Sequence, residues 1–176
     1  MTKTKEIVKA NDILLKFNIT EENLPIDIDY ILKRLNIDCY EVELPDNISG
    51  VLDTRSTKAI ILVNKAHSES RKRFSKAHEL GHYLLQKDFI GLRVDKQLFF
   101  RNNTSKKGTD KEEIEANKFA ASLLIPETIL TKIIFNKTTP FDTENEEDMS
   151  LLAKKFGVSI SALSIRIGKL IKVINV

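Results

Sequence analysis

One short motif constrains this chain of 176 residues more than any other feature of its sequence. His78, Glu79 and His82 form the pattern His-Glu-x-x-His. Four residues make about one turn of an α-helix, so the two imidazoles face the same side of the helix. Glu79 lies beside them, where it can reach a water molecule on a metal ion. The motif therefore predicts a helix at this point and a zinc site that hydrolyses peptide bonds.

The composition is that of an ordinary globular chain. Apolar residues make up 41% and charged residues 30%, and the net charge of +3 is too balanced to indicate nucleic-acid binding by itself. Cys39 is the single cysteine, so no internal disulfide can form, which fits a reducing compartment. The N-terminal stretch lacks an apolar signal core, and no apolar run is long enough to cross a bilayer. We expect a cytoplasmic protein that does not associate with membranes.

Hydrophobic periodicity divides the chain into helices and a small sheet. Helices are expected at residues 4–17, 26–35, 69–86, 111–125, 127–136, 148–156 and 160–171, and strands at 37–44, 49–54 and 58–64. Residues 97–100 are a further candidate strand, and residues 102–108 are expected to form a polar loop. The pattern predicts an α+β fold, in which a small three-stranded, antiparallel-type sheet packs on a helical core.

These elements suggest three segments along the chain. Residues 1–36 form N-terminal helices, and residues 37–137 form a metallopeptidase core that contains the motif. Residues 138–176 form a C-terminal helical segment, which we expect to pack on the core.

The helix that carries the motif has one apolar face. Its members are Phe74, Ala77, Gly81, Leu84 and Leu85. We expect His78 and His82 to lie half-buried at the border of this face, with Glu79 and Ser75 turned further toward solvent. Gly81 lowers helix propensity by about 1 kcal/mol relative to alanine, so its presence predicts that another backbone packs closely against it.

Two histidines are not enough for a catalytic zinc site, which usually has three protein ligands. His67 lies just before the helix and is poorly placed to be the third. The helix expected at 111–125 places Glu113 and Asn117 at one edge of its apolar face. An inward carboxylate needs a partner, which favours Glu113 as the ligand, and Asn117 is placed to hydrogen-bond a ligand histidine. Glu112 also lies near the buried side and remains a competitor.

Together these residues predict metal-assisted hydrolysis. Glu79 would take a proton from the attacking water and pass it to the leaving amine. Tyr83 is a poor candidate for a second oxyanion donor, because its helical phase turns it away from the metal. The strand at 59–64 could offer an edge to which an extended substrate adds as a further strand.

Three stretches of the chain resemble the ImmA/IrrE family of metallo-endopeptidases. They are Arg71–Leu85, Glu113–Pro126 and Leu152–Ser159, which from first to last span most of residues 50–170. The resemblance implies a zincin-like α+β fold for the core, a zinc cofactor, and a glutamate as third ligand, carried here onto Glu113. It also implies a substrate class: helix-turn-helix repressors of mobile elements or stress regulons, cut at one site and often encoded beside the peptidase.

Two other interpretations remain open. Residues 149–170 have the spacing of a helix-turn-helix unit with its turn at Gly157, which suggests a DNA-binding regulator. Arg166 and Lys169 are few cations for phosphate contacts, so we favour a packing or substrate-docking role for this unit. The third interpretation is an antirepressor that binds a repressor without cutting it. The intact motif argues against it, because a pure binder does not need Glu79.

Overall fold

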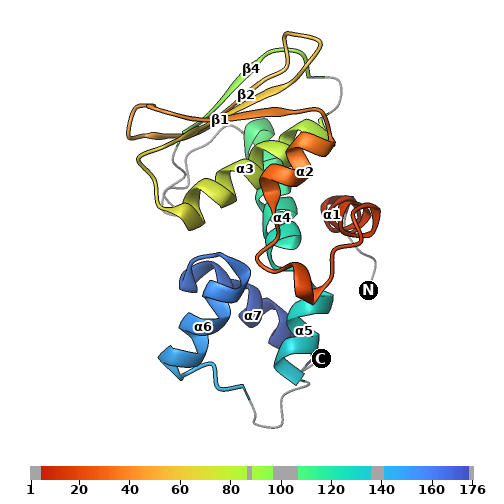
Figure 1. Ribbon diagram of the computed structural model, residues 1–176, viewed down its shortest axis with the longest axis vertical. Coiled ribbons are helices and arrows are strands. Elements are labelled where there is room, and N and C mark those ends of the chain that lie inside the picture. Colours follow the sequence, from red (N-terminus) through yellow and green to blue (C-terminus); the bar gives the residue numbers. More distant parts are fainter. Residues whose placement is uncertain (1–4, 87–88, 97–106, 136–140, 175–176) are drawn as a thin grey trace.

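The computed structural model describes residues 5–86, 89–96, 107–135 and 141–174. The helices are α1 (Lys5–Lys16), the short 3-10 helix η1 (Glu21–Asn23), α2 (Ile28–Arg34), α3 (Glu69–Leu85), α4 (Lys107–Leu124), α5 (Glu127–Phe135), α6 (Glu146–Phe156) and α7 (Ile160–Ile174). The strands are β1 (Asp38–Val42), β2 (Ile48–Asp53), β3 (Ile60–Asn64) and β4 (Leu92–Lys96). Figure 1 shows the sheet at one end of the molecule, helices α5, α6 and α7 at the other end, and α3 and α4 between them.

The fold class is α+β, as predicted, but the sheet differs from the prediction. It has four strands in the order β1-β3-β2-β4, and β1 runs parallel to β3 while β2 is antiparallel to both β3 and β4. The parallel pair arises because β3 inserts between β1 and β2, an arrangement that local sequence patterns do not encode. The prediction of three strands of antiparallel type was therefore wrong in number and in pairing.

The position of β3 also corrects the expected substrate edge. Because β3 is hydrogen-bonded to β1 on one side and to β2 on the other, the strand expected at 59–64 offers no free edge. The outermost described strands are β1 and β4. The candidate strand at 97–100 and most of the loop expected at 102–108 lie outside the described residues, while Lys107 and Gly108 already belong to α4.

Helix α3 lies under the sheet and packs tightly against α4. It begins after its N-cap residue Ser68, whose hydroxyl makes no capping hydrogen bond. A Cβ atom added at Gly81 would lie 3.2 Å from the Cα and carbonyl oxygen of Ala116 in α4. The close backbone approach predicted at Gly81 is confirmed, and it brings the motif helix and the glutamate-bearing helix together.

The C-terminal helices are joined to this core through two arginines. Gly157, between α6 and α7, has φ 66°, a left-handed conformation that favours glycine. Arg73 of α3 donates hydrogen bonds to the carbonyl oxygens of Gly157 (3.1 Å) and Ile26 (2.8 Å). Arg166 of α7 donates to the carbonyl oxygen of Ile125 at 3.1 Å. These bonds hold the turn between α6 and α7 against α3, and α7 against the end of α4.

No described helix combines the length and the apolar character needed to span a membrane. The division of the chain into segments at 1–36, 37–137 and 138–176 remains a prediction. Most buried apolar side chains of the described residues belong to one cluster, which has members in all three segments.

Candidate metal centre

Three side chains from two helices bring their ligand atoms together. The Nε2 atoms of His78 and His82, one turn apart on α3, lie 2.9 Å from each other. Glu113 of α4 places Oε2 3.2 Å from Nε2 of His78 and Oε1 3.3 Å from Nε2 of His82. His78 and His82 are 2% and 1% exposed, so they are buried and not half-buried as expected. The sheet and α4 cover a face of α3 that its helical periodicity alone predicts to be partly exposed.

The spacing of these atoms fits a tetrahedral metal ion. Zinc bonds to histidine nitrogen and carboxylate oxygen measure about 2.0–2.1 Å, so two ligand atoms of a tetrahedron lie about 3.3 Å apart. The three observed separations of 2.9, 3.2 and 3.3 Å are close to that value. Two imidazoles and a carboxylate are also the donor set of many catalytic zinc sites, with a fourth position left for water or substrate.

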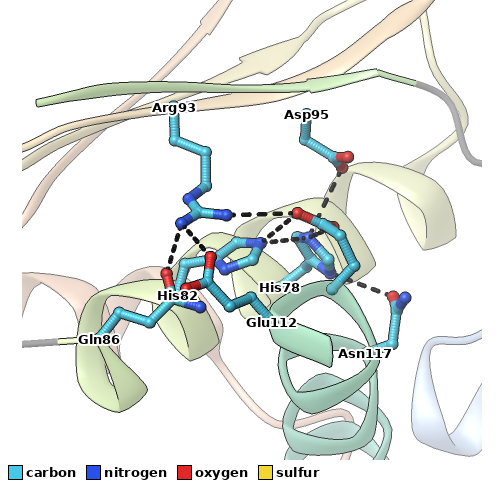
Figure 2. Close-up of polar contacts among 8 residues, drawn as sticks. His78, His82, Gln86, Arg93, Asp95, Glu112 and Asn117 are labelled. Carbon is cyan, nitrogen blue, oxygen red and sulfur yellow. Dashed lines mark hydrogen bonds and ion pairs between the residues drawn. The ribbon is translucent and has the colours of Figure 1, made fainter. Parts of the chain in front are cut away.

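A hydrogen bond to Asn117 orients one of the histidines. Nδ1 of His78 lies 3.1 Å from Oδ1 of Asn117, one turn beyond Glu113 on α4. An amide oxygen only accepts, so Nδ1 donates and Nε2 is left with a free lone pair. Figure 2 shows Asn117 on the far side of His78 from Arg93, with His82 facing the other ring nitrogen. The contact between Asn117 and a motif histidine is the one expected from sequence.

The electrostatics of this group favour a charged carboxylate facing buried imidazoles. Although burial acts against ionisation, the nearby imidazoles of His78 and His82 hold the pKa of Glu113 well below its usual value. Burial lowers the pKa of His82, which keeps that imidazole neutral. Burial also opposes the charging of His78, but the carboxylate of Glu113 raises its pKa. An anionic centre with imidazole lone pairs directed inward is suited to a divalent cation.

Glu79 is the most deeply buried acid of the site. It is 0% exposed, and neither carboxylate oxygen has a hydrogen-bond partner among the described residues. Burial raises the pKa of Glu79 to about 8. The expectation that Glu79 turns toward solvent was wrong, because β2 crosses over it at Gly50. A Cβ atom at Gly50 would lie only 2.5 Å from Oε1 of Glu79, so glycine is what leaves room for the carboxylate.

Strand β4 brings two further charged residues over the site, and sequence reasoning missed both. Arg93 and Asp95 alternate with Leu92 and Val94, so their side chains share the inner face of the sheet. Figure 2 shows both reaching down from the strand toward His78 and His82. Oδ2 of Asp95 lies 3.8 Å from Nε2 of His78, and burial raises the pKa of Asp95 to about 6.

The contacts of Arg93 differ between the two candidate acids of α4. One guanidinium nitrogen of Arg93 donates to Gln86 (2.6 Å) and to Glu112 (2.7 Å), and the other lies 3.5 Å from Oε1 of Glu113. Glu112 is thus engaged by arginine, whereas Glu113 faces both histidines. Of the described residues, His78, His82 and Glu113 form one group that could hold a metal ion, and His78, Glu79 and Asp95 form a second, overlapping one. His67 belongs to neither group.

Comparison with known families gives one match. A peptidase family model described as the IrrE N-terminal-like domain matches residues 32–168. No curated protein matches the chain. The matched region contains the motif helix, the glutamate helix and the whole sheet, and it continues through α6 and most of α7.

Proposed function

The chain belongs to the ImmA/IrrE family of metallopeptidases, and from this premise we propose that it is a zinc-dependent endopeptidase that cuts a helix-turn-helix transcriptional repressor at one site. The observation that carries the proposal is the convergence of His78, His82 and Glu113 beside the carboxylate of Glu79, which has no hydrogen-bond partner among the described residues. Buried polar groups normally have partners, so this cluster of buried acceptors supports a binding site for a cation.

In the proposed reaction zinc is held by His78, His82 and Glu113. When bound, it lowers the pKa of its water to about 7 and polarises the substrate carbonyl. Glu79 accepts the proton of the attacking water and delivers it to the leaving amine. Its site under β2, where Glu79 is 0% exposed, excludes bulk water. Asn117 keeps the His78 ring in the tautomer that this arrangement needs.

The repressor substrate is proposed from the family resemblance, and the cytoplasm is the compartment where such a repressor would be met. DNA binding by the chain itself is less favoured by its contacts. Arg166, one of the three cations of α7, is turned inward onto Ile125 and lies 3.8 Å from Glu127. Lys169 and Lys172 remain on this helix, which is little charge for a phosphate backbone.

The test is incubation of the purified chain with the helix-turn-helix repressor encoded beside it. We expect one cut with zinc, none with a chelator, and none with the Glu79→Gln variant, whose zinc content stays at one ion per chain. Glutamine keeps the shape of the side chain but cannot accept the proton, so binding of the repressor persists while hydrolysis stops.

The same variant separates the competing functions. Loss of repression that survives Glu79→Gln identifies an antirepressor that acts by binding. Cleavage that survives a chelator, with the zinc removed, contradicts the metal mechanism. Retention on duplex DNA that weakens steeply with salt supports the DNA-binding alternative.

A further inference from the structure

A groove of about 480 Å³ leads from the surface to His78. One wall is the first half of α3, including Phe74, and the opposite wall is the start of α7 with the turn before it. The apolar residues of this second wall are Val158, Ala162 and Ile165. The bottom of the groove reaches His78, Asp95 and Asn117, so whatever enters it meets the candidate metal centre.

The second wall is fixed relative to the metal-binding helix. Arg73 of α3 donates to the carbonyl oxygen of Gly157, directly before Val158. Arg166 anchors the next turn of α7 to Ile125, at the end of α4. A Cβ atom at Gly157 would lie 2.8 Å from Nε of Arg73 and 2.9 Å from Cβ of Pro25, which shows how closely this turn is packed. The start of α7 is thus held at a set distance from α3.

The wall is open, and it presents three apolar side chains beside Ser159 and Ser161. Ile165 is 51% exposed, and Val158 and Ala162 are partly exposed, although all three are apolar. Among the residues that line the groove Arg71 is the one cation, which is too little charge to hold a nucleic-acid backbone. Apolar side chains facing a groove that ends at a hydrolytic site are suited to a peptide side chain.

Resting on the proposed peptidase function, we propose that the start of α7 is the specificity wall of the active site. It receives an apolar side chain of the substrate, next to the bond that is cut. Phe74 contacts that side chain from α3, and Ala162 and Ile165 contact it from α7. The helix-turn-helix-like unit therefore reads the substrate polypeptide and not DNA.

Two peptidyl hydroxamates that differ at one side chain test this without turnover. The hydroxamate group binds zinc, and the adjacent side chain is isobutyl in one compound and hydrogen in the other. In calorimetry with the zinc-loaded full chain, we expect the isobutyl compound to bind about tenfold tighter or more, as a filled apolar pocket allows. Ala162→Phe fills the groove and should bring the ratio of the two dissociation constants close to one.

Two further variants make the result decisive. Ile171→Phe changes an exposed residue of the same helix that does not line the groove. This variant should leave the ratio of the two dissociation constants as it is in the unmodified chain. Ile165→Asp, at another exposed position, should lower the ratio even if Ala162→Phe fails to fold. Equal binding of both compounds to the unmodified chain, or an unchanged ratio in both groove variants, overturns the specificity wall while the peptidase proposal stands. Failure of both compounds to bind the zinc-loaded chain refutes the peptidase proposal itself.

Discussion

Two polar clusters lie on the same helix, under the same sheet, and they differ in how their charges are matched. In the first cluster, on the N-terminal half of α3, Lys76 is 8% exposed at its side chain and pairs with Asp29 at 2.9 Å and Glu41 at 3.0 Å. Lys72 pairs with Glu41 at 2.6 Å. Each buried cation has at least one acid as partner, and these contacts tie α3 to α2 and β1.

The second cluster, formed by the motif and Glu113, has acids and imidazoles but little to balance them. Glu79 has no hydrogen-bond partner among the described residues, and the two Nε2 atoms face each other and a carboxylate. The nearest cation, Arg93, is engaged mainly by Gln86 and Glu112. The difference teaches that burial alone does not mark a functional site. What marks it is a buried cluster whose charges need something that the chain does not supply.

The largest effect is expected from removing a ligand of the second cluster. Glu113→Ala should abolish stoichiometric zinc binding, because a site with two histidines and no carboxylate holds zinc poorly. Glu112→Ala is the matched control, since its partner is Arg93, and it should keep one zinc per chain. The zinc content of both variants is measured after dialysis. Zinc retained in Glu113→Ala but lost in Glu112→Ala would reverse the assignment of the third ligand.

The same pair of variants also separates stability from metal binding. Zinc that binds only the folded chain raises its stability by about 4 kcal/mol at a thousand times the dissociation constant. Added zinc should therefore raise the melting temperature of Glu112→Ala and leave that of Glu113→Ala unchanged.

The next largest effect concerns the room above Glu79. Gly50→Ala places a methyl group 2.5 Å from the present position of Oε1, so the carboxylate must move. A displacement of about 1 Å in a reacting group can cost a hundredfold, and we expect cleavage to fall about ten- to a hundredfold with zinc content unchanged. Gly168→Ala is the control, because no atom of the described residues lies within 4 Å of a Cβ atom there. Full activity in Gly50→Ala would show that Glu79 tolerates the shift and is not held in a defined position.

The sequence predicted the residues of the second cluster better than their surroundings. The helical spacing of His78 and His82, and the phase of Glu113 in its own helix, follow from the 3.6-residue period, which is a local property. The burial of Glu79 depends on Gly50, a residue of a distant strand, and the phase of a single helix contains no information about what covers it.

Strand β4 shows the same limit of prediction from sequence. Its alternation of Leu92 and Val94 with Arg93 and Asp95 is visible in the sequence, but the ordinary interpretation places the charged residues toward solvent. Here they face inward, because the carboxylates and imidazoles below the sheet give them partners. The pairing of β1 with β3 was also beyond prediction, since strand order depends on long-range packing.

A smaller effect is expected when the first cluster is broken. Lys76→Met removes a buried cation that bridges Asp29 and Glu41. Both acids are partly exposed to solvent, which moderates the loss to about 1–2 kcal/mol in the free energy of unfolding. Lys58→Met, in the more exposed pair with Asp38, is the control and should change stability by about 0.5 kcal/mol or less. Urea titration measures both variants. If zinc content falls in Lys76→Met, the two clusters are coupled and the contrast between them fails.

The smallest effect concerns Cys39, on the inner face of β1 beside the first cluster. Burial raises the pKa of the thiol from 9.0 to about 11. The thiolate therefore forms more easily in the unfolded chain, so the stability contributed by the neutral thiol is complete below pH 9 and is lost as the pH rises toward 11. At pH 8 the folded chain should react with a disulfide reagent about tenfold more slowly than the denatured chain.

Zinc makes this reaction a test of the contrast between the clusters. Cys39 belongs to neither group of described residues that could hold a metal ion. Saturating zinc should therefore leave its rate of modification unchanged in the folded chain, provided that conditions are too mild for unfolding. Strong protection by zinc would mean that metal binding tightens the first cluster as well. The matched charges around Lys76 would then take part in the metal site's function instead of only holding α3 to the sheet.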